Sequence, residues 1–155
     1  MNRRTLFSVD RVYRYALWRE WGGESYAMFI GLNPSTADET VDDPTIRRCV
    51  AFAKAWGYGA LCMTNLFAYR ATDPKHMIAA VDPVGPENDA MLLDVANGAG
   101  VRVAAWGVHG THLNRDIAVQ SIMPAMHVLK LTKHGRPGHP LYLPKTLRPV
   151  EWTRP

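Results

Sequence analysis

The feature that most constrains this fold is the alternation of short apolar runs with helix-like segments. Four runs have the length and composition of buried strands: SYAMFIGL (25–32), ALCMTNLFAYR (60–70), VRVAAWG (101–107) and HVLKL (127–131). Continuous apolar runs of this kind are typical of parallel strands that are covered on both faces. Helical patterns separate the runs, which favours right-handed crossovers and two helical layers. We therefore expect an α/β fold, a three-layer α/β/α sandwich with a central four-stranded parallel sheet.

The first helix carries the clearest start and stop signals, in DDPTIRRCVAFAKAWGYG. Asp43 suits the N-cap, Pro44 suits the first helical position, and Gly57 suits the end. Further helices are predicted for a short stretch from Pro74 and within 85–100 and 111–123. The first 22 residues alternate as an exposed strand or hairpin does. The Pro-rich tail is expected to be irregular, with a short helix near its end.

Composition indicates one folded domain spanning 1–155, with 47% hydrophobic and 21% charged residues. Lys and Arg outnumber Asp and Glu by 18 to 14, which is compatible with a phosphate-bearing partner but does not establish one. Cys49 and Cys62 lie in apolar stretches and are expected to be reduced thiols. The sequence shows no apolar leader, membrane span or metal-ligand spacing. We expect a cytoplasmic protein with no membrane partner, no metal and no cofactor.

Polar residues stand where the predicted strands end. Asn33 ends the first strand and Asn65 the second, Trp106 and His109 follow the third, and His139 follows the fourth. Open α/β sheets bind ligands beyond the carboxyl ends of their strands. Carboxamides suit the edge of a nucleobase, and an imidazole can stabilise a developing oxyanion. The alternative is that the asparagines cap turns and His139 only packs.

Several short motifs of the sequence resemble those of the bacterial and phage family DUF1643, whose activity is not defined. They are LNPSTAD, DDPTIRRC, NLFAYRATDP, DPVGPEND, AAWG and HPLYLP, and the resemblance runs from about residue 13 to residue 144.

A more distant resemblance is to the uracil-DNA glycosylase superfamily. That superfamily has a Gly-x-Asn-Pro or Gly-x-Asp-Pro motif after its first strand and an Asn that ends an LLLN-like strand. An LLWG-like strand and a closing His-Pro-Ser motif follow. Similar words occur here in the same order, as GLNP (31–34), LCMTN (61–65), VAAWG (103–107) and GHPLYLP (138–144).

This second resemblance implies roles for three residues. Asn33 matches the residue that positions the attacking water or supports the transition state. Asn65 matches the residue that reads the pyrimidine edge, and His139 matches the histidine that stabilises charge on the base. We expect Asn33 to serve the site rather than the fold, since Pro34 keeps its backbone extended.

The sequence also departs from the superfamily. A carboxamide at position 33 is not a general base, whereas an aspartate there would activate water better. Leu141 and Tyr142 follow the His-Pro pair in place of Ser-Pro, so the substrate-contacting loop differs. The acid-rich stretch 38–43 would repel phosphate, and within it Asp38 is a candidate functional acid.

The leading hypothesis is cleavage of the N-glycosidic bond of a nucleobase in DNA or in a nucleotide. Asn33, His139 and Asp38 are the candidate catalytic residues, and Asn65 is the candidate base reader. Further substrate-binding candidates are Phe67, Tyr69, Trp106, His109, Leu141 and Tyr142. Two alternatives stay open: a non-catalytic nucleobase-binding protein, and an enzyme of modified-base metabolism that uses Asp38 with His139. The oligomeric state and the role of the N-terminal aromatic segment are also open.

Overall fold

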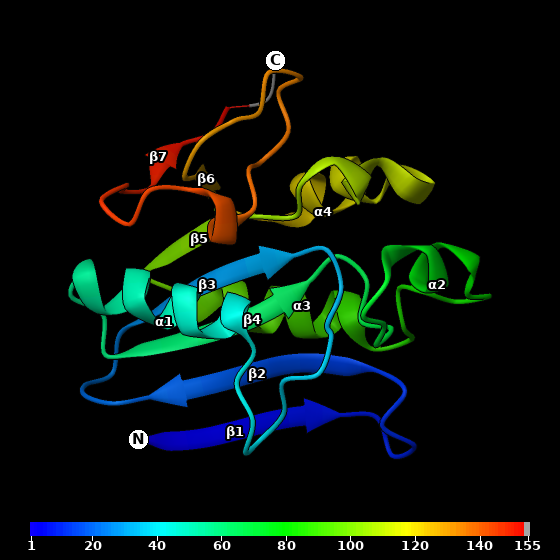
Figure 1. The fold of residues 1–155 in the computed structure, drawn as a ribbon, viewed down its shortest axis with the longest axis horizontal. Coiled ribbons are helices and arrows are strands. Elements are labelled where there is room, and N and C mark those ends of the chain that lie inside the picture. Colours follow the sequence, from blue (N-terminus) through cyan, green and yellow to red (C-terminus); the bar gives the residue numbers. More distant parts are fainter. Residues whose placement is uncertain (154–155) are drawn as a thin grey trace.

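A seven-stranded β-sheet forms the middle layer of the protein (Figure 1). The structure is a computed structural model, and it describes residues 1–153. The strands, in the order in which they lie side by side, are β1 (Asn2–Phe7), β2 (Arg14–Glu20), β4 (Ala60–Asn65), β3 (Tyr26–Gly31), β5 (Val101–Ala104), β6 (His127–Val128) and β7 (Val150–Glu151).

The sheet is mixed. Pairing is parallel between β4 and β3, between β3 and β5, and between β5 and β6. It is antiparallel where β1 and β2 extend one side of the sheet and β7 extends the other. The α/β class is therefore confirmed, but the sheet has seven strands of mixed direction in place of the four parallel strands predicted.

The N-terminal segment forms a hairpin of β1 and β2. β2 is mostly buried, contrary to the exposed strand that its alternation suggested, because it lies between β1 and β4. The register of the hairpin shifts between Leu6 and Phe7, which pair with Ala16 and Arg14. This shift leaves Tyr15 as an extra residue and turns the start of β2, an effect typical of a β-bulge.

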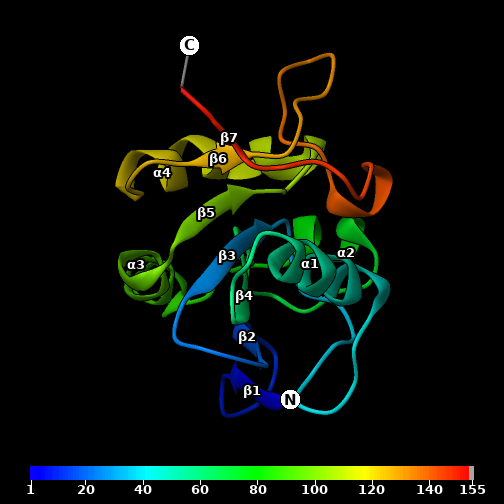
Figure 2. The same cartoon turned by 90° about the vertical axis from the view of Figure 1, so that its left-hand side faces the viewer.

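Helices cover both faces of the sheet (Figure 2). α1 (Pro44–Ala55) packs Ile46 and Phe52 against Phe29 on one face, which we call the α1 face. α3 (Asn88–Gly98) and α4 (Arg115–Ile122) pack on the opposite face, which we call the α3 face, where Leu92 meets Ile30. The short helix α2 (Pro74–Ala79) also contributes Met77 to the core of the α3 face.

The predicted helix starts are confirmed for α1 and α2. Asp43 Oδ1 accepts a 2.8 Å hydrogen bond from Ile46 N, and Asp73 caps α2 through Lys75 N. Gly57 follows α1 with a φ of 88°, a conformation that glycine adopts without strain.

Two predictions for the second half are wrong in their bounds or type. The helix expected over 111–123 begins only at Arg115, because Leu113 and Asn114 have φ values of 56° and 53°. A 3₁₀ segment, η1 (Val108–Asn114), precedes it. The tail contains the 3₁₀ turn η2 (Pro140–Tyr142) and ends in edge strand β7 in place of a short helix.

Within the described part of the chain, no helix is both long enough and apolar enough to cross a membrane. Cys49 and Cys62 are both free and buried, and burial raises the pKa of each thiol.

Candidate functional site

The carboxyl ends of β3, β4, β5 and β6 lie along one edge of the sheet because these strands pair in parallel. We call it the carboxyl edge. β3 lies between β4 and β5. α1 connects β3 to β4 across one face, and α3 connects β4 to β5 across the other. The connections that leave β3 and β4 thus cross opposite faces of the sheet. Open α/β sheets bind ligands beyond the strand ends at such a point, and the predicted strand-end residues lie along this edge.

Asn65 is the most informative of these residues. It ends β4, it is only 2% exposed, and its Nδ2 has no hydrogen-bond partner among residues 1–153. Met63 packs on the α1 face, and alternation along the strand places Asn65 on the same face. A buried amide without a partner is costly in a folded protein, and such groups call for an explanation.

Gly31, the first residue of the GLNP motif, provides the space for this carboxamide. A Cβ atom on Gly31 would lie 2.8 Å from Asn65 Oδ1 and 2.9 Å from Met63 Cε. Glycine is therefore required at this position by the close approach of Asn65.

Asn88 fixes the backbone beneath the site. It is completely buried, and its Nδ2 donates 3.0 Å hydrogen bonds to the carbonyl oxygens of Asn65 and Leu66. The sequence analysis did not single out Asn88, although it belongs to the DPVGPEND word that carries the family resemblance.

Asn33 has a clear structural role. Its Nδ2 donates to Ala71 O at 2.8 Å and to Pro34 O at 3.2 Å. Backbone hydrogen bonds run alongside, from Leu66 N to Gly31 O, from Phe67 N to Leu32 O and from Ala71 N to Pro34 O. The chain after β3 is thus joined to the chain after β4. Among the described residues no donor bonds Asn33 Oδ1, so that oxygen is free for a ligand or water.

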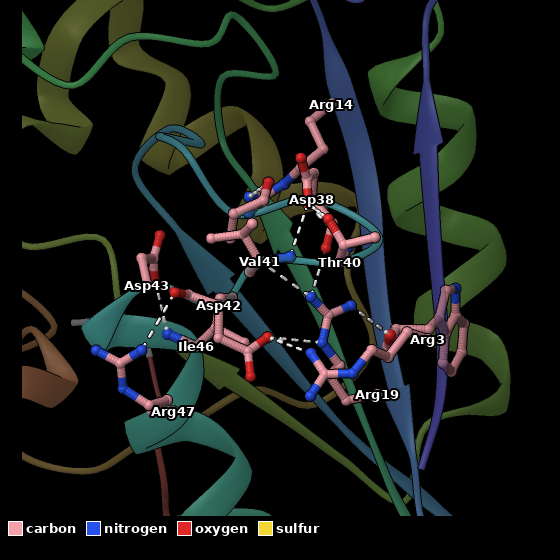
Figure 3. A network of polar contacts seen from close by, with 12 residues as sticks. Arg3, Arg14, Arg19, Asp38, Thr40, Val41, Asp42, Asp43, Ile46 and Arg47 are labelled. Carbon is pink, nitrogen blue, oxygen red and sulfur yellow. Dashed lines mark hydrogen bonds and ion pairs between the residues drawn. The ribbon is translucent and has the colours of Figure 1, made fainter.

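Asp38 is engaged within its own loop. Its Oδ1 accepts hydrogen bonds from Thr40 N and Val41 N, each 2.8 Å, and from Thr40 Oγ1 at 3.1 Å (Figure 3). The bonds from the Thr40 and Val41 amides hold the pKa of Asp38 below its usual value. The carboxylate is therefore a loop-stabilising anion and a weak proton acceptor.

Three arginines of the N-terminal hairpin, of which only Arg19 is buried, pair with further acidic residues of this loop. Asp42 Oδ1 accepts a 2.8 Å bond from Arg19 Nε and a 3.0 Å bond from Arg3 Nη1 (Figure 3). Arg11 pairs with Glu39 at 3.2 Å. These contacts offset the repulsion that the sequence predicted between this loop and phosphate.

His139 is held in one defined orientation. Its Nδ1 accepts a 3.2 Å hydrogen bond from Leu141 N. Burial lowers the pKa of His139, and the negative charge of Asp43 opposes this shift. The ring is accordingly neutral at pH 7 with its proton on Nε2, which can donate to a ligand. η2 packs on α1, where Arg48 Nη2 contacts Leu141 O at 3.4 Å, so this segment lies on the α1 face.

The structure separates the predicted residues into two groups. Asn65 and the His139 segment, with Leu141, lie on the α1 face. Phe67 and Trp106 belong instead to the buried core of the α3 face. The ring of Phe67 is completely buried and lies 5.6 Å from the ring of His112.

The other predicted aromatic and imidazole groups are more exposed. Tyr69 is half-buried and packs edge-on against Tyr13 with ring centroids 6.2 Å apart. His109 is exposed in η1. Tyr142 is 83% exposed, and its ring centroid lies 5.5 Å from that of His139.

Arg14 is a residue that the sequence analysis missed. It is 2% exposed at the start of β2, and its Nη1 donates a 3.0 Å bond to Ala37 O. Its Nε has no partner and no carboxylate pairs with it among the described residues. Burial lowers its pKa to about 10, so it stays charged. No local pattern distinguishes this arginine from the exposed ones around it.

Two surface hollows lie elsewhere. One of about 350 Å³ is lined by Tyr13, Tyr15 and Glu87 beside the β1–β2 hairpin. The other, of about 180 Å³, is lined by Met123, Met126 and Trp152. Neither includes Asn65 or His139. Because Asn65 is only 2% exposed, a ligand reaches its side chain only if the neighbouring chain shifts. Among the described residues, no cluster of His, Cys, Asp or Glu is arranged to hold a metal.

Comparison with known proteins gives one match. No curated protein and no solved structure matches the chain. Residues 14–141, which include the ends of β3, β4 and β5 and the His139 loop, match the model of DUF1643, described as a protein of unknown function. The chain therefore belongs to the DUF1643 family.

Proposed function

We propose that this protein binds a nucleobase of DNA or of a nucleotide at the carboxyl edge and cleaves its N-glycosidic bond. The observation that carries the proposal is the buried carboxamide of Asn65, whose Nδ2 lacks a partner within residues 1–153. A carboxamide presents a donor and an acceptor side by side, which is the pattern of a pyrimidine edge. The similarity of the GLNP, LCMTN, VAAWG and GHP words to the uracil-DNA glycosylase superfamily supports this choice.

Once the base is bound, the reaction needs two tasks from the protein: stabilisation of the charge on the leaving base and orientation of one water. The bond between the sugar carbon and the base nitrogen breaks, and its electron pair stays on the base. His139 Nε2–H donates to the oxygen on which that negative charge develops. A water oxygen then bonds to the sugar carbon and releases its proton to solvent. Asn33 Oδ1 accepts a hydrogen bond from this water and orients it, since a carboxamide cannot take the proton.

Access to Asn65 requires a local opening. The loop 33–43 leaves β3 at the carboxyl edge, and η2 packs on α1. These segments are therefore the candidates for the local opening. A base that is flipped out of a strand, or a free nucleotide, is small enough to enter such an opening. We propose that base entry displaces one of these segments.

A second candidate is binding of the base without cleavage. Position 33 holds a carboxamide, and the Asp38 carboxylate accepts three hydrogen bonds in its own loop. Neither residue offers a strong base to activate water. In this second candidate function, the site binds the base and hydrolyses its N-glycosidic bond slowly or not at all.

The test uses single- and double-stranded oligonucleotides that contain uracil, mismatched thymine or alkylated bases, together with free nucleotides. Chromatography detects the released base, and fluorescence anisotropy detects binding. Asn65→Asp removes the Nδ2 donor, and we expect a loss of binding or release of about tenfold or more. Asn97→Asp makes the same chemical change at an exposed position of α3 and should have no effect.

Each outcome has a defined meaning. Base release that depends on Asn65 supports cleavage, and Asn65-dependent binding without release supports the second candidate. If no base-containing ligand binds, or if Asn65→Asp and Asn97→Asp behave alike, the proposed function is overturned.

A further inference from the structure

Positive charge is concentrated in the last quarter of the chain. No Asp or Glu lies between Asp116 and Glu151. The same stretch holds five Lys and Arg residues: Lys130, Lys133, Arg136, Lys145 and Arg148. In the rest of the chain Asp and Glu balance Lys and Arg almost evenly, and several of them form ion pairs. The net charge of +4 therefore arises in this C-terminal stretch.

Residues 130–138 form a self-supported hairpin. Leu131 bridges Pro137 in antiparallel fashion. The backbone hydrogen bonds that close it run from Gly138 N to Lys130 O, from Thr132 N to Arg136 O and from Gly135 N to Thr132 O, at 2.8, 2.7 and 2.9 Å. These bonds fix the backbone that carries Lys130 and Lys133. The segment is the orange loop that stands away from the helices in Figure 2.

The base of this hairpin is attached to the carboxyl edge. Gly107 N, just after β5, donates a 2.9 Å hydrogen bond to Pro137 O. His139 follows two residues later, and exposed Tyr142 packs beside its ring. The basic hairpin and the proposed base-binding site are therefore continuous along the chain and share one edge of the sheet.

We infer that hairpin 130–138 binds the phosphate backbone of a nucleic acid strand, so that the ligand of the carboxyl edge is a polynucleotide. This inference rests on the proposed function and narrows its substrate class. Lys130 and Lys133 contact successive phosphates, while Tyr142 offers an exposed ring to a neighbouring base. The phosphate of a free nucleotide lies close to its base. Once that base is bound at the carboxyl edge, the phosphate would not reach lysines on a projecting hairpin.

The hairpin is poorly suited to a membrane surface. Stable binding to a lipid surface takes an apolar face that inserts below the headgroups or a cluster of about four or more cations. The tip consists of Lys133, His134 and Gly135, and Leu131 is only 40% exposed. Cations combined with one exposed aromatic ring fit a nucleic acid strand better.

The experiment measures the affinity of the full chain for a fluorescent single-stranded oligonucleotide across a range of salt concentrations. In Lys130→Gln/Lys133→Gln we expect roughly tenfold weaker binding to every sequence, with the slope of log K against log salt reduced by about 1 to 2. The matched control is Arg4→Gln/Lys54→Gln, which removes the same charge from exposed positions in β1 and α1 and should change neither value. Free deoxyribonucleotide and anionic phospholipid vesicles are added as competitors.

The inference is overturned if both double variants weaken binding equally, or if the free nucleotide competes as well as an unlabelled oligonucleotide. It is also overturned if the lysine pair affects vesicle binding and leaves oligonucleotide binding unchanged. These outcomes can be distinguished from a failure of the proposed function. That function is tested separately, by the effect of Asn65→Asp on the binding of free nucleotides and on base release. Both double variants should have the melting temperature of the wild type, which confirms that the comparison is between folded proteins.

Discussion

The side-chain amide of Asn33 donates a 2.8 Å hydrogen bond to the carbonyl oxygen of Ala71. One carboxamide thereby joins the chain that leaves β3 to the chain that leaves β4, and both segments bound the proposed site. The same side chain keeps its Oδ1 free of protein donors among the described residues. Asn33 therefore combines a structural bond through nitrogen with an oxygen available to water or ligand.

Asn33→Ala should lower the free energy of unfolding by about 0.5–1.5 kcal/mol, because the part-buried carbonyl oxygens of Ala71 and Pro34 lose their donor. For a chain of this size that corresponds to a fall in melting temperature of about 2–4 °C per kcal/mol. Ser35→Ala is the matched control, since Ser35 Oγ makes only an exposed 3.2 Å bond to Thr72. Equal melting temperatures for the two variants would show that the Asn33–Ala71 bond contributes nothing to stability.

Asn33→Asp tests the chemistry at the same position. A carboxylate is better than a carboxamide at activating water, so hydrolysis should rise if the site cleaves a glycosidic bond. It also places an oxygen opposite the carbonyls of Ala71 and Pro34, and stability at neutral pH should fall further than in Asn33→Ala. Base release must therefore be measured below the melting temperature of this variant. If the rate of release is the same as in the wild type, Asn33 does not position the attacking water.

Gly31→Ala should abolish base binding while the protein stays folded. The new Cβ would lie 2.8 Å from Asn65 Oδ1 and would force that carboxamide to move, at a cost of about 1–3 kcal/mol in stability. Gly22→Ala is the control because a Cβ there has no neighbour within 4 Å. Binding of free nucleotides, which does not depend on hairpin 130–138, and thermal melts measure the two effects separately. Full binding by Gly31→Ala would mean that Asn65 does not read the base.

Local signals made the central elements of the fold predictable. Continuous apolar runs indicated the strands that became β3, β4 and β5, and Asp-Pro pairs marked the starts of α1 and α2. The alternation of the first 22 residues indicated the hairpin of β1 and β2, although not the burial of β2. Strand β7 could not be assigned in the same way, because it is only two residues long and lies in a Pro-rich segment. The left-handed residues Leu113 and Asn114, which delay α4, also lack a strong local signal.

The positions of the candidate site residues were predictable, but their contacts were not. Parallel strands share one edge, so Asn33, Asn65 and His139 could be placed there from the order of the runs. The sequence did not indicate which hydrogen-bonding groups the fold itself uses. Asp38 and the amide of Asn33 are largely engaged within the protein, whereas Asn65 Nδ2 is not. Such distinctions depend on contacts between loops that only the folded chain brings together.

The stability of the protein should depend on the protonation of His139. Burial lowers the folded-state pKa of this ring below its usual value of 6.5, so the unfolded chain binds the proton more readily. The stabilisation is complete above pH 6.5 and is lost as the pH falls through the lowered folded-state pKa. Protonation of Nδ1 also breaks its bond from Leu141 N, so base binding should decline over the same range.

Chemical denaturation from neutral to acidic pH, for wild type and His139→Gln, measures this contribution as a difference. The difference in unfolding free energy should shrink as the pH falls. His134→Gln, in the exposed hairpin, controls for the loss of one imidazole. A difference between wild type and His139→Gln that stays constant with pH would contradict the prediction.

Two buried arginines of β2 provide the last prediction, because they have different partners. Arg19 Nε donates a 2.8 Å bond to the Asp42 carboxylate, and its other nitrogens bond the carbonyls of Trp18 and Asp38. The Arg14 side chain hydrogen-bonds the carbonyl oxygen of Ala37 and forms no ion pair within the described part of the chain. Breaking a buried ion pair from one side costs about 3–5 kcal/mol, whereas replacing a poorly paired buried charge by an apolar side chain is often neutral or stabilising. Arg19→Met should therefore strongly destabilise the protein, and Arg14→Met should lower the unfolding free energy by less than about 1 kcal/mol.

Urea denaturation of the two variants, which carry the same substitution five positions apart in one strand, measures both effects. If Arg14→Met costs as much as Arg19→Met, the bond to Ala37 is a main support of the loop over the carboxyl edge, and Arg14 is explained by the fold alone.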